Sequence, residues 1–322
     1  MNSGFGGLIR RFLQRPAAPL LLLLASVILF LMATDHFFGM TPDSIRHFYG
    51  LEHFSRKADD YPLSVHFLDV GQGDCIFIAC EGRYAMIDTG DYSLHSKAVQ
   101  YLERYGIDRL DLLIVTHTDS DHIGDFQSLS DHVRIDNVVL SPYDVVGEEL
   151  SDTQKLFYDK LREEKLPVLD PTNREFPLGS ATLRVLSPAK AYRTKNNNSL
   201  VIRLEYGQVS YLFTGDIGQQ VEKELLDADI DLSADVLKIA HHGSRYATSQ
   251  AFYDAVSPTY AVLSVSAEND YQLPHREVMD RIRASRTTLL RTDKNGDIII
   301  ATDGTRIQYY YANRYSTVAQ KT

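Results

Sequence analysis

The sequence predicts an α/β protein in which two stacked β-sheets are covered by helices on their outer faces. Two observations indicate this class. Segments with strand-like hydrophobic patterns alternate with segments of helical spacing, and the chain falls into two halves that each begin with strands and end with a helix. This alternation leaves several α/β layouts open. The polar motifs that follow four of the strands decide between them, in favour of an αββα four-layer sandwich.

The predicted elements follow from these patterns in chain order. Apolar runs bounded by turn residues predict strands, and apolar residues three or four apart predict helices. The run 110–116 is nearly all apolar, which is typical of a strand covered on both faces. Further strands are predicted at 64–68, 75–79, 84–87, 138–140, 182–186, 235–240 and 260–265, with hairpins at 200–213 and 298–310. Helices are predicted at 97–105, 152–165, 249–256 and 275–285.

The N-terminal segment has the pattern of a membrane anchor. An apolar run at residues 17–33 follows Arg10, Arg11 and Arg15, and no arginine or lysine comes directly after it. A run of about 17 residues is at the lower end of what spans a bilayer, and basic residues favour the cytoplasmic side. The pattern therefore predicts a single-pass protein of the cell membrane, with a cytoplasmic basic stub and one transmembrane helix in residues 1–40; a cleaved signal peptide is the alternative.

The rest of the chain is then expected on the extracytoplasmic side. Residues 41–62 are polar, contain two prolines and predict a juxtamembrane linker, and residues 63–322 form the folded domain. The formal net charge of the chain is −10. Because an acidic surface repels polyanions at long range, binding to nucleic acid would require a metal ion and a local basic patch.

Four candidate metal ligands lie within six residues, directly after the buried strand 110–116. They are His117, Asp119, Asp121 and His122. Alternating direction in an extended segment places the first three on one side, and the turn into the next helix brings His122 to join them. Imidazole and carboxylate groups at this density are typical of a metal site.

Three further motifs follow hydrophobic strands elsewhere in the chain. They are Asp88-Thr89-Gly90, Thr214-Gly215-Asp216 and His241-His242-Gly243-Ser244. Each motif alone is weak evidence. Because strand ends gather at one edge of the sheets in open α/β layers, the four motifs together predict one site, with Asp216 and His241 as further metal ligands.

With these motifs the chain resembles the metallo-β-lactamase superfamily, whose signature is a His-x-His-x-Asp-His loop followed by later His, Asp and His ligands. Within it, the sequences Leu68-Asp69-Val70-Gly71-Gln72-Gly73-Asp74 and Leu237-Lys238-Ile239-Ala240-His241-His242 resemble the hydrolase domain of ComEC-type DNA-uptake proteins. The same holds for the segments 117–122, 197–201 and 213–216. The resemblance begins near Leu63 and implies the metallo-β-lactamase fold.

The resemblance also implies roles for individual residues. Asp121, His122 and His241 would bind one ion, and Asp216 would lie between two ions. His117 and Asp119 would serve a second site, which lacks the family's mid-chain histidine. We therefore expect one secure site and a weaker second one. Oxygen-rich ligands make Mn²⁺ an alternative to Zn²⁺.

The implied chemistry is hydrolysis by a metal-activated water, whose pKa falls from 15.7 to about 7 on a catalytic ion. Asp119 is a candidate ligand or base, His242 and His275 are candidate proton donors, and Asn198 or Ser199 would hold a substrate oxygen. The predicted function is a metal-dependent phosphodiesterase, with DNA or nucleotides as the substrate. Two alternatives remain open. One is cleavage of another envelope phosphodiester, such as a phospholipid or teichoic-acid headgroup. The other is a non-catalytic metal-binding module of a membrane complex.

Overall fold

The computed structural model describes residues 58, 60–93, 96–143, 149–172, 175–228 and 230–312. All of them belong to the compact unit Arg56–Thr322. The predicted membrane span at residues 17–33 lies outside the described residues. Within the described part of the chain, no helix combines the length and the apolar character needed to cross a bilayer.

Two large β-sheets form the centre of this unit. The first contains β1 (Leu63–Phe67), β2 (Ile76–Cys80), β3 (Arg83–Ile87), β5 (Leu112–Val115), β7 (Val138–Leu140), β8 (Val168–Leu169), β16 (Ile298–Thr302) and β17 (Ile307–Tyr311). Its eight strands have the order β17-β16-β1-β2-β3-β5-β7-β8. A small sheet pairs β4 (Arg109–Leu110) with β6 (Arg134–Ile135).

The second large sheet contains β9 (Glu175–Leu178), β10 (Ala181–Ser187), β11 (Val201–Tyr206), β12 (Val209–Phe213), β13 (Val236–Lys238), β14 (Tyr260–Leu263) and β15 (Thr288–Arg291). These seven strands have the order β15-β14-β13-β12-β11-β10-β9. In both sheets the strands joined by hairpins are antiparallel, whereas β3-β5-β7-β8 and β12-β13-β14-β15 are parallel. Parallel neighbours need a crossover connection, and helices supply it.

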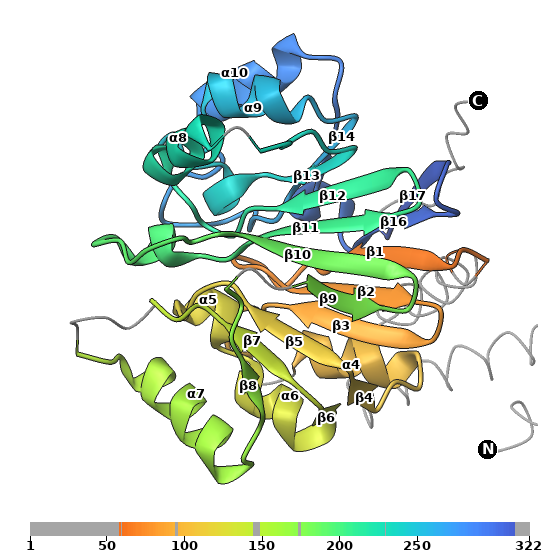
Figure 1. Ribbon diagram of the computed structural model, residues 1–322, viewed down its shortest axis with the longest axis vertical. Coiled ribbons are helices and arrows are strands. Elements are labelled where there is room, and N and C mark those ends of the chain that lie inside the picture. Colours follow the sequence, from red (N-terminus) through yellow and green to blue (C-terminus); the bar gives the residue numbers. More distant parts are fainter. Residues whose placement is uncertain are drawn as a thin grey trace, which may run out of the picture. The chain divides into compact units, whose positions relative to one another are not determined.

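The helices are α4 (Lys97–Arg104), α5 (Ser120–Ile123), α6 (Phe126–His132), α7 (Asp152–Glu163), α8 (Gln219–Asp227), α9 (Gln250–Val256), α10 (Arg276–Ala284) and α11 (Thr292–Asn295). Two 3₁₀ turns, η1 (Lys195–Asn198) and η2 (Ala240–Gly243), lie in loops. Figure 1 shows α4, α6 and α7 on one outer side of the stacked sheets and α8, α9 and α10 on the other.

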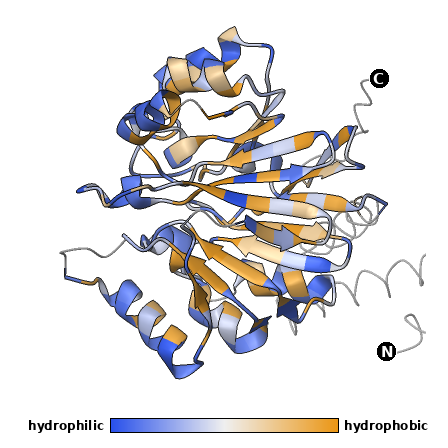
Figure 2. Cartoon of the chain, in the orientation of Figure 1, coloured by the Kyte–Doolittle hydropathy of each residue, from blue (hydrophilic) through white to orange (hydrophobic). Residues whose placement is uncertain are grey.

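Three hydrophobic clusters hold these layers together. The central cluster joins the inner faces of the two sheets, for example through Phe67 of β1 and Phe213 of β12, whose ring centroids are 6.2 Å apart. A second cluster packs α4, α6 and α7 on the first sheet, and a third packs α8, α9 and α10 on the second. In Figure 2 the strands are largely hydrophobic, while the helices carry hydrophilic faces. The predicted αββα sandwich is therefore confirmed.

The sequence did not predict several of these elements. The strands β4, β6 and β8 have two residues each, which is too short for a hydrophobic pattern to appear. The helix α6 buries only Phe126 and Leu129. The helix α8 carries a readable signal, because Val221 and Leu225 are four residues apart and both buried, but it was not predicted.

A buried histidine of β1 that faces α4 makes the stability of the domain depend on pH. His66 is only 3% exposed; its Nδ1 lies 2.6 Å from Tyr101 Oη and its Nε2 lies 2.7 Å from Ser64 Oγ. Burial lowers the pKa of His66 from 6.5 to about 3. Between these values the unfolded chain binds a proton that the folded chain does not, so stability is present above pH 6.5 and is lost as the pH falls.

We therefore expect the free energy of unfolding to fall more steeply with decreasing pH in the wild type than in His66→Gln. The difference in slope reaches about 1.4 kcal/mol per pH unit for one proton. Urea unfolding of both proteins at several pH values between 6.5 and 4 measures it. Parallel curves for the two proteins would contradict the assignment.

Candidate metal centre

The four polar motifs meet at the carboxyl ends of parallel strands. Asp88 follows β3 and His117 follows β5 in the first sheet, while Asp216 follows β12 and His242 follows β13 in the second. The pairs β3-β5 and β12-β13 are each parallel, so their carboxyl ends lie at the same edge. Residues from both sheets therefore converge on one point between them.

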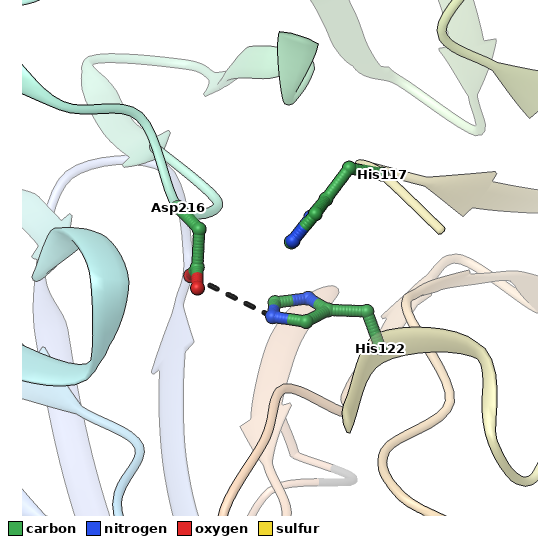
Figure 3. A group of neighbouring side chains, drawn as sticks. All are labelled: His117, His122 and Asp216. Carbon is green, nitrogen blue, oxygen red and sulfur yellow. Dashed lines mark ion pairs between the residues drawn. The ribbon is translucent and has the colours of Figure 1, made fainter. Parts of the chain in front are cut away.

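The first group of candidate ligands is His117, His122 and Asp216, whose donor atoms all lie within 4.8 Å of one another. Figure 3 shows the three side chains directed toward a common centre from the β5 loop, from α5 and from the loop after β12. Nε2 of His122 is 3.6 Å from Oδ1 of Asp216. Imidazole nitrogen and carboxylate oxygen at these separations can share one cation.

A second group contains Asp121, His122 and His242. Nε2 of His242 lies 3.2 Å from Oδ2 of Asp121 and 3.4 Å from Oδ2 of Asp216, and Nε2 of His122 lies 3.9 Å from Oδ2 of Asp121. The two oxygens of Asp216 thus face different histidines. Asp216 belongs to the first group and also lies beside His242 of the second, so it is within reach of both; its predicted place between two ions stays a prediction.

The donor atoms of this cluster lack the partners that buried polar atoms normally have. Nε2 of His117, Nε2 of His122, Nε2 of His242 and Oδ1 of Asp216 are all buried, and none has a hydrogen-bond partner among the described residues. Because such atoms are rare in folded proteins, a group of four pointing at one place requires an explanation. A divalent cation fits, since these nitrogen and oxygen atoms are the ligands that Zn²⁺ and Mn²⁺ take.

The imidazoles of the cluster lower the pKa values of its carboxyl groups. Burial opposes the charge on Asp216, but the imidazoles of His242 and His122 together outweigh it and hold the pKa of the carboxyl well below its ordinary value. The pKa of Asp121 is also lowered, because His122 and His242 overcome the effect of burial. Although burial lowers it, the carboxylates raise the pKa of His242 to about 10, and they likewise raise that of His122, so a cation that binds here would take the place of the protons on these imidazoles.

Asp88 orients the candidate ligand His122 through the imidazole nitrogen that faces away from the cluster. Its Oδ2 lies 2.7 Å from Nδ1 of His122, and its two oxygens accept hydrogen bonds from N and Oγ1 of Thr116 at 2.7 and 2.6 Å. A carboxylate on one imidazole nitrogen leaves the other nitrogen free to bind a cation. The sequence predicts Asp88 as part of the site without a role of its own, and the structure supplies this contact.

Gln154 supports the ligand loop from another helix. Its Oε1 accepts a hydrogen bond from N of Ser151 in a capping box at the start of α7, and its Nε2 donates to Oγ1 of Thr118 at 2.7 Å. Thr118 lies between His117 and Asp119. The start of α7 is therefore tied to the loop that carries the candidate ligands.

The two adjacent histidines after β13 point in different directions. His241 and His242 both have left-handed backbone conformations, with φ of 49° and 50°. Nδ1 of His242 lies 3.0 Å from the Ser264 carbonyl oxygen, to which it can donate, so its Nε2 faces Asp121 and Asp216. The His241 side chain is 33% exposed, and its Nε2 is 3.8 Å from Oδ2 of Asp216. The geometry thus places His242 beside Asp121, where the sequence prediction had His241.

The two predicted substrate-binding residues, Asn198 and Ser199, use their side chains in hydrogen bonds that stabilise their own loop and its contact with Asp216. Asn198 accepts a hydrogen bond from N of Tyr192 at 2.7 Å and donates to its carbonyl at 3.1 Å. Oγ of Ser199 donates to the carbonyl of Asn196 at 2.6 Å and accepts from N of Asp216 at 3.2 Å. Both residues are buried.

Asn196 is instead the residue of this loop that reaches the cluster. Its Nδ2 lies 3.3 Å from Nε2 of His241, and its side chain is partly exposed. The sequence could not separate it from its neighbours, because three asparagines follow one another and the 3₁₀ turn η1 decides which one faces the site.

The remaining predicted residues lie at the margin of the cluster. The side chain of Asp119 is 37% exposed, and its Oδ2 is 3.6 Å from Nε2 of His117. His275 occupies the N-cap position of α10, where its Nδ1 accepts a hydrogen bond from N of Arg245 at 3.1 Å. This contact gives His275 a structural role in the loop that follows His242.

Replacing Asp88 tests the contacts behind His122. We expect Asp88→Ala to lower the free energy of unfolding by about 3 kcal/mol or more, because it leaves buried donors of Thr116 and His122 without an acceptor. Urea unfolding at neutral pH measures this loss. Asp131→Ala, which breaks an exposed ion pair with Lys160, is the control and should cost less than about 1 kcal/mol. A similar small loss for Asp88→Ala would refute the prediction.

Comparison with known proteins places this geometry in a family. Residues 68–267 match the model of the metallo-beta-lactamase superfamily. The chain is 34% identical over 274 residues to ComE operon protein 3 of Bacillus subtilis (strain 168), covering 79% of this chain and 34% of that protein. It is 31% identical over 287 residues to competence protein ComA of Neisseria gonorrhoeae, covering 87% of this chain and 38% of that protein.

The chain thus spans little more than a third of the length of these relatives. Among solved structures, the metallo-beta-lactamase fold protein YhfI from Bacillus subtilis covers 77% of this chain and is fully covered itself, with 11% identity and a TM-score of 0.48. The sequence match extends from the end of β1 past β14, and so includes all four polar motifs. The chain therefore belongs to the metallo-beta-lactamase superfamily and, within it, is similar to ComEC-type competence proteins.

Proposed function

We propose that this chain is a metal-dependent hydrolase of phosphodiesters, with DNA or nucleotides as its substrate class. The observation that carries the proposal is the set of four buried donor atoms from both sheets that face one point and have no hydrogen-bond partner in the described part of the chain. The superfamily match supports metal-dependent hydrolysis. The relative named as a competence protein supports nucleic acid as the substrate class.

Two neighbouring sets of ligands are available for cations. Asp121, His122 and His242, with one oxygen of Asp216, would hold one ion. His117 and Asp119, with the other oxygen of Asp216, would hold a second. A bound Zn²⁺ or Mn²⁺ would supply Lewis acidity, and it would lower the pKa of a water molecule bound to it to about 7. Its positive charge also offsets the acidic character of the chain, which otherwise disfavours an anionic substrate.

The partly exposed side of the cluster is where a substrate would bind. Asn196 offers an amide N–H₂ beside His241, and amide donors can stabilise the oxygen atoms of a phosphoryl group. Asp119 is the most exposed carboxylate of the cluster and is our candidate for proton transfer. The buried residues would hold the ion, and these partly exposed ones would contact the substrate.

We also propose that residues 17–33 anchor the chain in the cell membrane, with the hydrolase domain outside the cytoplasm. The apolar run and the three arginines before it support this arrangement. The site would then act on phosphodiesters outside the cell membrane.

The central test combines elemental analysis with an assay of bis(p-nitrophenyl) phosphate cleavage. We expect the wild type to retain divalent metal and to turn over this substrate. Asp121→Ala and His242→Ala should lose metal, and their kcat/KM should fall roughly 100-fold or more. His132→Ala, which changes an exposed histidine on α6, is the matched control and should behave as the wild type. A metal-free wild type, or full turnover by Asp121→Ala, would refute the proposal.

The substrate class is tested separately with fluorescent single-stranded DNA. Cleavage of DNA that needs the added metal and is lost in Asp121→Ala would support the nucleic-acid assignment. Cleavage of a phospholipid or teichoic-acid headgroup without cleavage of DNA would instead favour the alternative envelope substrate.

Replacing Asn196 tests the substrate side of the site. We expect Asn196→Ala to lower kcat/KM for the phosphodiester about 10- to 100-fold, because one donor to the phosphoryl oxygens is lost, while its metal content stays that of the wild type. Steady-state kinetics and elemental analysis of the same preparation measure both quantities. Loss of metal from Asn196→Ala, or unchanged kinetics, would exclude this role.

A further inference from the structure

A fully buried ion pair lies behind the candidate metal centre. Nζ of Lys238 is 2.6 Å from Oδ2 of Asp74, and the two side chains are 0% and 2% exposed. Lys238 is the last residue of β13 in the seven-stranded sheet, whereas Asp74 precedes β2 in the eight-stranded sheet. The pair therefore joins the two sheets at the edge where the candidate ligands converge.

Stability alone is a poor explanation for this pair. Removing two charges from water costs free energy that their mutual attraction repays only partly, and apolar residues of similar size often replace such pairs without loss. Three hydrophobic clusters already hold the layers of the domain together. The contacts of Asp74 and Lys238 with neighbouring loops indicate a different role for the pair.

Asp74 contacts two candidate ligands. Its backbone N–H donates a hydrogen bond to the carbonyl oxygen of Asp121 at 3.2 Å. Its Oδ1 is buried, has no hydrogen-bond partner among the described residues, and lies 3.9 Å from Nδ1 of His242. The turn before Asp74 also packs closely against the loop that carries Asp121, because a Cβ at Gly73 would clash with the carbonyl oxygen of Asp121.

Lys238 contacts the ligand loops of the other sheet. Its carbonyl accepts a hydrogen bond from Oγ1 of Thr214 at 2.7 Å, two residues before Asp216. Lys238 also lies four residues before His242, in the segment that leads from β13 to that histidine. The backbones of the two ion-pair partners thus hold the segments that carry Asp121, Asp216 and His242, and the side chains hold these backbones together.

We infer that Asp74 and Lys238 are positioning residues that set the distance between Asp121 of the first sheet and His242 of the second. This inference rests on the proposed function, because it assigns the pair a role in metal binding. Breaking the pair leaves the sheets packed by their apolar core but releases the ligand loops. Loss of Lys238 also leaves the Asp74 carboxylate uncompensated close to the anionic ligands Asp121 and Asp216.

The test uses the full chain and four variants: Lys238→Met, Asp74→Asn, the double variant Asp74→Asn/Lys238→Met, and Arg203→Met. The double variant leaves no unpaired charge. Its Co²⁺ affinity can therefore be measured even if a single variant does not fold. Arg203→Met is the matched control, because Arg203 is a nearly buried cation paired with Glu205 at 2.7 Å on β11. For each protein, Co²⁺ binding gives an affinity and a visible absorption spectrum, and urea unfolding gives the stability.

We expect each single variant and the double variant to bind Co²⁺ at least roughly tenfold more weakly than the wild type, with an altered spectrum. The double variant should recover stability relative to the single variants without recovering affinity. Arg203→Met should lose stability but keep the wild-type affinity and spectrum.

Two results would overturn the inference. One is wild-type Co²⁺ affinity and spectrum in the double variant, which would leave the pair a purely structural one. The other is an Arg203→Met protein that weakens Co²⁺ binding as much as Lys238→Met does. Failure of the wild type itself to bind Co²⁺ would refute the proposed function and this inference with it, and so is distinguishable from both.

Discussion

The spacing between the two sheets is the constraint on which the metal centre depends. His117, Asp121 and His122 come from the loop after β5 in one sheet, whereas Asp216 and His242 follow strands of the other. Two of the distances that define the cluster, 3.6 Å from His122 to Asp216 and 3.2 Å from His242 to Asp121, are therefore measured across the interface of the sandwich. The apolar core that joins Phe67 to Phe213 fixes this interface. Because close-packed interiors do not deform continuously, the core determines the site as well as the stability.

Much of the fold and the outline of the site follow from the sequence. Parallel strands must be joined by crossovers, so their carboxyl ends gather at one edge, and the four polar motifs stand directly after such strands. The position of these strand ends predicted that His117, Asp121, His122 and Asp216 come together, while the αββα layers followed from the alternation of strands and helices and from the family resemblance that the motifs carry. The first of these predictions needs only the order of strands and motifs, which the printed sequence contains.

The order of strands and motifs does not determine which side chains the local backbone conformation directs into the site. His241 and His242 are identical in type and adjacent, and only their left-handed conformations decide which ring faces Asp121. In the same way, the turn η1 directs Asn196 toward the cluster and turns Asn198 back to Tyr192. Hydrophobic spacing carries no information on such choices. The membrane anchor, in contrast, stays a prediction of the hydropathy pattern, because residues 17–33 lie outside the described part of the chain.

The left-handed pair at His241 and His242 also restricts how this loop can change in evolution. Each position holds a residue in a conformation that favours glycine, at a cost of about 1–3 kcal/mol. Glycine would relieve the backbone and remove the ring, whereas a β-branched residue would lose the ring and worsen the backbone. Few single substitutions are therefore tolerated at either position. Divergence of the site should enter instead through the neighbouring loops, such as the one that carries Asn196.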